Sequence, residues 1–137
     1  MVKLIMGLKG SGKTKKLVDL VRKAVDEAHG NVVCIEKDKN LTYDIPYTAR
    51  LIHAAEYGIN SNTLLRGFIS GLHAGNYDIT HFFIDNFYKL VNDKEGANVV
   101  SFIQWLAEYA ERENVEFVIS MSSDREKCPE EIKQYLI

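Results

Sequence analysis

Residues 7–14 read Gly7-Leu8-Lys9-Gly10-Ser11-Gly12-Lys13-Thr14. They match the pattern G-x-x-x-x-G-K-[ST], the Walker A or P-loop motif, at every fixed position. Glycines in such a loop let backbone N–H groups turn toward phosphate oxygens without interference from a Cβ atom. Lys13 is expected to reach the β- and γ-phosphates and to stabilise their charge, and the Thr14 hydroxyl is expected to bind Mg²⁺. The motif therefore predicts binding of a nucleoside triphosphate with magnesium, and it does not separate ATP from GTP.

The segments on either side of this loop support the same interpretation. Residues 2–6 form a short apolar run that stops at Gly7, which is typical of a buried strand. From Gly12 onward, apolar residues recur at helical spacing while charged residues occupy the other face. A loop between a strand and a helix places the positive end of the helix at the phosphates.

The rest of the chain alternates between apolar runs and helical patterns. Further strands are predicted at residues 32–35, 80–84 and 116–121, with a polar loop over 36–47. Helices are predicted at 48–57, from Asn60 or Ser61 to Gly75, at 97–113, and from Pro129 onward. Gly67 and Gly71 lie one turn apart in the second of these helices, and we interpret them as positions of close packing against a neighbouring backbone.

This alternation predicts an α/β protein, a three-layer α/β/α fold around a mostly parallel sheet of four to five strands. The ligand would bind at the edge where the strands have their carboxyl ends. A length of 137 residues fits one domain, so we expect residues 1–137 to form a single nucleotide-binding unit.

The composition of the chain limits the kinds of partner and the compartment that we expect. The net charge of −2 gives no overall basic field, so nucleic acid is not an expected partner, and no apolar run is long enough to cross a membrane. Cys34 and Cys128 belong to no CxxC pair and the histidines have no metal-ligand spacing. These features favour a reduced, cytoplasmic protein with Cys34 buried.

Acidic residues at strand ends are the candidates for metal binding and water activation. Asp85 follows the apolar run Phe82–Ile84, where an aspartate would hold Mg²⁺ together with Thr14. The next residue is Asn86, which cannot act as a base. Glu36 ends the second predicted strand and is the other candidate, although it could equally be a solvated residue that begins a charged loop. Ser120, Ser122 and Ser123 could contact the γ-phosphate or could form a turn.

At these residues the chain resembles a minimal RecA-like ATPase domain of the P-loop NTPase superfamily, from Lys3 to Ser123. The resemblance implies that Glu36 activates water, that Asp85 is the magnesium-associated aspartate, and that Ser120 or Ser122 senses the γ-phosphate. It also implies that the first strand lies at an edge of the sheet. Because a bare apolar edge invites pairing, we expect the last helix or a second copy of the chain to cover it.

Three functions are compatible with these features. The first is Mg-dependent, slow ATP hydrolysis that acts as a switch, with the segment 37–47 as the moving part. The second is a nucleotide-binding regulatory module without hydrolysis, which the asparagine at position 86 keeps open. The third is a small-molecule kinase, although no segment dense in arginine is available as a lid. We also expect a homo-oligomer or a protein partner.

Overall fold

A computed structural model of the chain describes residues 1–93 and 96–137 and has an α/β fold. The strands are β1 (Val2–Gly7), β2 (Asn31–Glu36), β3 (Arg50–His53), β4 (Ile79–Ile84) and β5 (Glu116–Ser122). The α-helices are α1 (Lys13–Glu27), α2 (Asn62–Gly75), α3 (Phe87–Val91) and α4 (Val99–Glu113). Three 3-10 helices complete the described elements: η1 (Ala54–Tyr57), η2 (Arg125–Lys127) and η3 (Glu130–Tyr135).

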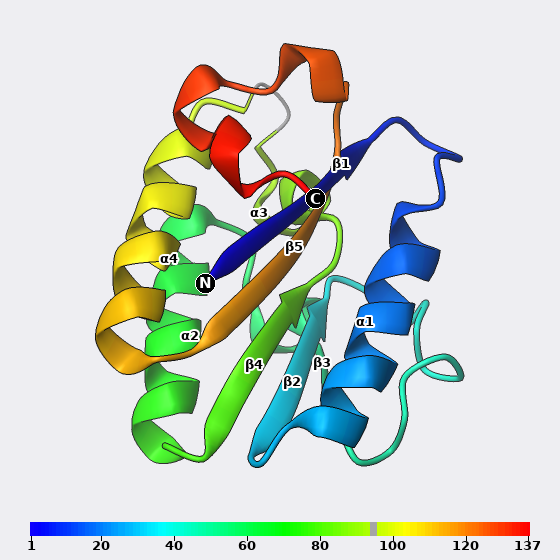
Figure 1. The fold of residues 1–137 in the computed structure, drawn as a ribbon, viewed down its shortest axis with the longest axis vertical. Helices are drawn as coiled ribbons and strands as arrows, with labels where there is room; N and C mark the ends of the chain where they lie inside the picture. The colour runs from blue at the N-terminus through cyan, green and yellow to red at the C-terminus, as the bar shows by residue number, and fades with distance from the viewer. Residues whose placement is uncertain (94–95) are drawn as a thin grey trace.

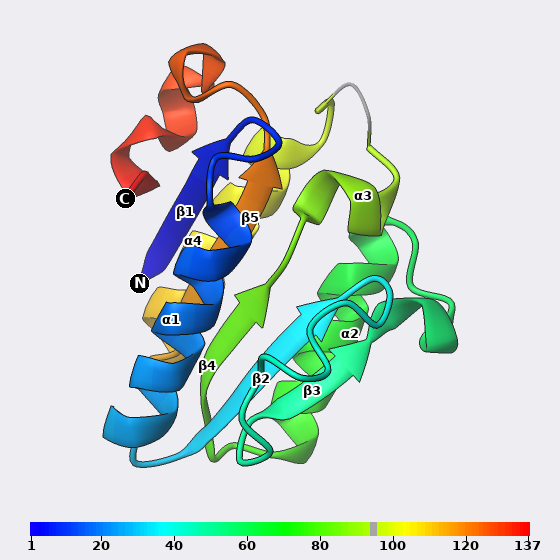
Figure 2. The same cartoon turned by 90° about the vertical axis from the view of Figure 1, so that its right-hand side faces the viewer.

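The five strands form one parallel sheet in the order β1-β5-β4-β2-β3 (Figure 2). All strands therefore have their carboxyl ends at the same edge, which Figure 2 shows beside the loop between β1 and α1. The strand that carries the Walker A motif lies at one side of the sheet, with β5 between it and β4. The predicted parallel sheet is confirmed.

Helices cover both faces of the sheet, so the predicted three-layer α/β/α arrangement is confirmed. Helix α1 packs on one face, and α2 and α4 pack on the other (Figure 1). The core has two parts, one on each face. The part under α1 includes Leu17, Val21, Cys34, Phe83 and Val118. The larger part under α2 and α4 includes Leu4, Ile35, Phe82, Phe102 and Phe117.

The helices predicted after the Walker A loop, after Ser61 and over 97–113 are confirmed as α1, α2 and α4. Ser61 is the N-cap of α2, where its Oγ accepts a hydrogen bond of 3.2 Å from the amide of Leu64. Helix α4 begins at Val99, two residues later than predicted. Within residues 1–93 and 96–137, no helix has the combination of length and apolarity that a membrane span requires.

The prediction of a short helix over residues 48–57 is wrong. Residues 50–53 form the parallel strand β3, in which Leu51 lies opposite Cys34 and Ile52 lies opposite Ile35 of β2. Only the last four residues of the predicted helix, Ala54–Tyr57, are helical, as η1. A short apolar run does not distinguish a helix from a strand by its periodicity, and pairing with β2 decides the outcome here.

The end of the chain covers the edge of the sheet at β1. The helix predicted from Pro129 is the 3-10 helix η3, with Pro129 as its N-cap. Beyond it, the amide of Ile137 donates a hydrogen bond of 3.0 Å to the carbonyl of Leu4, and Leu136 forms a parallel bridge with the same residue. Figure 1 shows this segment beside β1. The expected cover is thus supplied from within the chain.

The interpretation of Gly67 and Gly71 as positions of close packing is also wrong. A Cβ atom built on either residue has no atom within 4 Å outside its own helix. Both glycines lie on the exposed side of α2.

Candidate nucleotide-binding site

Polar side chains at the ends of three strands lie on the face of the sheet that α1 covers. Side chains alternate between the two faces of a strand, so residues two apart share a face. The residues that pack against α1 near the strand ends are Cys34 in β2, Phe83 in β4 and Val118 in β5. The residues two positions further along are Glu36, Asp85 and Ser120. The same alternation therefore brings all three to the edge of the sheet where the Walker A loop lies.

The Walker A loop depends on glycine at two positions with a left-handed backbone. Gly10 has a φ of 84° and Gly12 a φ of 85°, a region that residues with a Cβ atom rarely adopt. The amide of Ser11 closes the turn with a hydrogen bond of 3.1 Å to the carbonyl of Leu8. A Cβ atom on Gly7 would collide with the side chain of Ser11. A larger residue at the first position of the loop would therefore require the Ser11 side chain to move.

The positive charge of the loop comes from helix α1 as well as from lysines. Gly12 is the N-cap of α1 and supplies no side-chain oxygen, and the first turn contains no acidic residue. The first amides of an α-helix have no acceptor within the helix, so those of α1 remain available to an anion. Lys13 directs its ammonium back over the loop, where it donates a hydrogen bond of 3.1 Å to the carbonyl of Leu8.

A cavity of about 300 Å³ lies between this loop and the ends of β4 and β5. Its lining residues are Lys9, Gly10, Gly12, Lys13, Thr14, Lys15, Asp85, Asn86, Ser120 and Ser122. Five of the eight predicted loop residues therefore line the cavity, together with both predicted metal ligands, Thr14 and Asp85. The other three loop residues, Gly7, Leu8 and Ser11, complete the turn without lining the cavity. Lys15 adds a third ammonium that the motif did not indicate.

Asp85 is held in place by Ser120. The buried Ser120 hydroxyl donates a hydrogen bond of 2.7 Å to Asp85 Oδ1 and accepts one of 2.8 Å from the amide of Asn86. Asn86 itself has a φ of 55°, which turns the chain sharply after β4. Sequence reasoning proposed Ser120 as a contact of the γ-phosphate and missed this role. The contact exists because β5 lies next to β4 in the sheet, and the sequence does not specify this order of strands.

Glu36 lies at the end of β2 but does not line this cavity. Its buried carboxylate accepts hydrogen bonds from the amides of Asn40, at 2.9 Å, and Leu41, at 3.1 Å. His53 Nδ1 lies 3.4 Å from Glu36 Oε2. Burial raises the pKa of Glu36 above its ordinary value, the two amides oppose that shift, and the charge of Asp85 adds to it. In this arrangement Glu36 fastens the loop that follows β2.

The residues of the cavity fit a magnesium ion bound together with phosphate. Mg²⁺ prefers oxygen ligands and commonly takes one or two from a protein while phosphates and water supply the rest. The Thr14 hydroxyl and the Asp85 carboxylate are ligands of this kind on one cavity. No group of three or more His, Cys, Asp or Glu side chains that could hold a metal ion occurs among the residues described in this structure.

Comparison with known proteins does not assign the chain to a family. No protein-family model matches the sequence, and a search of curated proteins finds no similar one.

Proposed function

We propose that this protein binds a nucleoside triphosphate with Mg²⁺ in the cavity at the Walker A loop, with ATP as the nucleotide to test first. The observation that carries the proposal is the set of residues on that one cavity. Lys13 and Thr14 of the motif line a cavity of about 300 Å³ together with Asp85, which follows β4, and Ser120 of β5. Their presence on one cavity supports the proposal, because the motif calls for phosphate-binding and metal-binding side chains at one place.

The electrostatics of the cavity favour a polyphosphate. Lys9, Lys13 and Lys15 line it, and the first turn of α1 adds free amides and the positive end of the helix dipole. Among the residues that the structure describes in this lining, Asp85 is the only carboxylate. A strongly anionic ligand would thus be balanced by three ammonium groups, and Asp85 would act through a cation rather than on the phosphate directly.

Hydrolysis in this proposal depends on the loop after β2. Glu36 is the candidate base, and its carboxylate is bound by the amides of Asn40 and Leu41 outside the cavity. To act on water, Glu36 would have to exchange these amides for the attacking water, which moves the loop. We therefore propose slow ATP hydrolysis that is coupled to movement of residues 37–47, the behaviour of a switch.

The hydrogen bonds that Glu36 accepts from the amides of Asn40 and Leu41 also favour a second candidate function. This function is a regulatory module that binds ATP without hydrolysing it. In that case Glu36 would serve only to fasten the loop. The two candidates share the binding site and differ in turnover. Incubating the protein with Mg-ATP and measuring free phosphate separates them, because only the first releases phosphate, and the release disappears in Glu36→Gln.

Binding itself is tested with Lys13→Ala. Isothermal titration with Mg-AMPPNP, a non-hydrolysable ATP analogue, should show at least a hundredfold loss of affinity, because a charge-assisted contact to two phosphates is removed. Lys16→Ala is the matched control, since Lys16 lies in the same turn of α1, is exposed, and does not line the cavity. Equal affinities for the wild type and Lys13→Ala would defeat the proposal.

A further inference from the structure

A second cavity adjoins the nucleotide cavity at the same edge of the sheet. It measures about 480 Å³ and is lined by Lys37, Asn86, Tyr88, Lys89, Asn92 and Ser122. Asn86 and Ser122 line both cavities, so they form a shared wall. The remaining residues come from the start of the loop after β2 and from α3 with its C-cap. A volume in this range suits a small molecule better than a segment of another protein.

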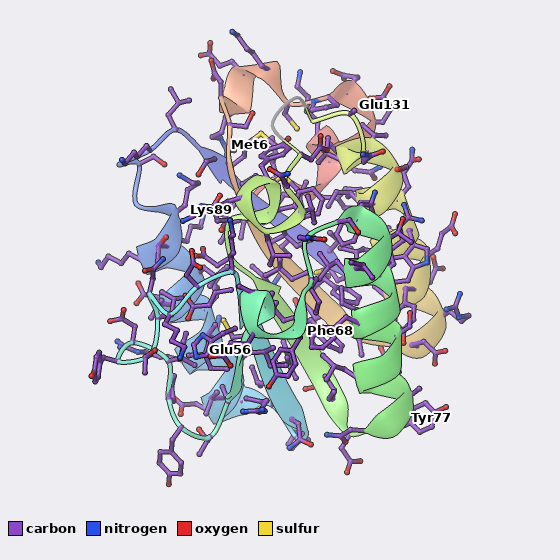
Figure 3. All side chains as sticks on the ribbon, turned by 180° about the vertical axis from the view of Figure 1, so that it is seen from behind. Met6, Glu56, Phe68, Tyr77, Lys89 and Glu131 are labelled. Carbon is purple, nitrogen blue, oxygen red and sulfur yellow. The ribbon has the colours of Figure 1, made fainter. Side chains whose placement is uncertain are left out.

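The second cavity has its own pair of lysines. Lys37 and Lys89 line it, whereas the lysines of the first cavity belong to the Walker A loop and the first turn of α1. Lys89 forms an ion pair of 3.4 Å with Asp38, in which both side chains are about half exposed. Figure 3 shows Lys89 projecting from α3 toward the side on which α1 lies. A half-exposed ion pair is weak, so an entering anion can compete with Asp38 for Lys89.

The neutral residues of this cavity can bind a polar ligand. Asn86, Asn92 and Ser122 offer amide and hydroxyl groups, and Tyr88 offers a phenol. Burial raises the pKa of Tyr88, and the charge of Asp93 adds to the shift, so the phenol is protonated at neutral pH and can donate a hydrogen bond. The described residues of this cavity thus combine two cations with several groups that form hydrogen bonds.

We propose that this second cavity binds a small phosphate-bearing molecule at the same time as the nucleotide, with Lys37 and Lys89 as its cation pair. Lysine binds phosphate as a point charge, and two ammonium groups with neutral donors are a suitable set. The shared wall of Asn86 and Ser122 would place this ligand next to the terminal phosphate. That position rests on the proposed function, whereas binding in the second cavity does not.

Inorganic phosphate is the probe for this proposal, and two-dimensional amide NMR is the measurement. Phosphate is titrated into the wild type saturated with Mg-AMPPNP, which fills the first cavity. It is also titrated, without nucleotide, into the Lys13→Ala variant. The first cavity of this variant lacks one of the lysines that are expected to bind phosphate. In both samples the amide signals of Lys89 and Asn92 should shift in a saturable way.

Charge variants then test the assignment in opposite directions. Lys37→Ala and Lys89→Ala should each weaken phosphate binding about fivefold or more, whereas Asp38→Asn should strengthen it two- to threefold. Lys133→Ala is the control, because Lys133 is exposed and pairs with Glu130 in η3. The amide spectrum of each variant reports whether it is folded, and the opposite sign for Asp38→Asn distinguishes binding from damage to the fold.

Shifts that do not saturate, or that are the same in Lys37→Ala, Lys89→Ala and the wild type, would overturn the proposal. Loss of Mg-AMPPNP affinity in Lys37→Ala and Lys89→Ala, with phosphate binding retained, would also overturn it, because the lysines would then belong to the nucleotide site. Failure of the wild type to bind Mg-AMPPNP, with the expected phosphate shifts in Lys13→Ala, would refute the proposed function and leave the second site supported.

Discussion

Ser120 donates a hydrogen bond of 2.7 Å to Asp85, and this contact joins the ends of two neighbouring strands. It fixes one carboxylate oxygen of Asp85 while both residues line the cavity. Because Ser120 also accepts a hydrogen bond from the amide of Asn86, its hydroxyl holds the turn that carries Asp85 away from β4. Ser120 is therefore a positioning residue for the expected metal ligand.

Replacing Ser120 by alanine should weaken the magnesium-dependent part of ATP binding about tenfold. The change leaves Asp85 free to rotate and leaves the amide of Asn86 without its partner, which should also lower the free energy of unfolding by about 1–3 kcal/mol. Titration of ATP with and without Mg²⁺ measures the first effect, and chemical denaturation measures the second.

Ser122→Ala is the matched control for this experiment. Ser122 ends the same strand and lines the same cavity, but its hydroxyl lies 3.5 Å from Asn86 Oδ1 and forms no bond to Asp85. Its replacement should change the effect of magnesium by less than about twofold. If Ser120→Ala retains the full magnesium effect, Asp85 is not the residue through which magnesium acts.

The Glu36→Gln substitution should lower ATP hydrolysis by at least about a hundredfold while ATP affinity changes little, because a general base contributes on that scale. The wild-type rate should fall as the pH falls through the pKa of Glu36, since only the ionised carboxylate can accept a proton. Burial places that pKa above the ordinary value of 4.5. The acid limb should be absent from the residual rate of Glu36→Gln.

Measuring kcat between pH 4.5 and 8, with the fold checked at each pH, tests this prediction. A wild-type protein that hydrolyses ATP with a profile unchanged in Glu36→Gln would remove Glu36 from catalysis. Its role would then be the fastening of the loop through Asn40 and Leu41.

The sequence was sufficient to predict the turn of the Walker A loop and some of the residues that line the cavity beside it. The Walker A motif specifies its own turn, and Gly10 and Gly12 have the left-handed backbone that a residue without a Cβ atom permits. Asp85 could be selected because it follows a buried strand. Its companion Ser120 could not, because their contact depends on β5 lying next to β4, which is a property of the whole sheet.

The same distinction explains the errors in the fold. Residues 50–53 contain two adjacent apolar residues, which satisfy a helix or a strand equally well, and only pairing with β2 makes them a strand. The direction in which the Glu36 carboxylate points also could not be predicted from the neighbouring sequence. It depends on how the loop of Asn40 and Leu41 folds back over the end of β2.

The exposed glycines of α2 give a prediction about stability. Gly67→Ala and Gly71→Ala should each raise the free energy of unfolding by about 0.5–1 kcal/mol, because alanine restricts the unfolded chain and the space around both positions is open. Chemical denaturation measures the change. Gly12→Ala is the contrasting variant and should be destabilised, since its φ of 85° disfavours a Cβ atom. Destabilisation by Gly67→Ala or Gly71→Ala would indicate that this face of α2 is covered in solution.

Deleting residues 130–137 should make the protein self-associate. This segment fills the edge of the sheet through the bond from Ile137 to Leu4 and buries Ile132 completely, so its removal exposes both a strand edge and an apolar surface. Sedimentation at several protein concentrations measures the effect. The Ile132→Ala substitution removes only part of the contact that holds this segment. It should lower the free energy of unfolding by about 2–5 kcal/mol. Gln134→Ala is the control, because Gln134 is exposed in the same segment. A deleted protein that stays folded and monomeric at all concentrations would show that the β1 edge needs no cover.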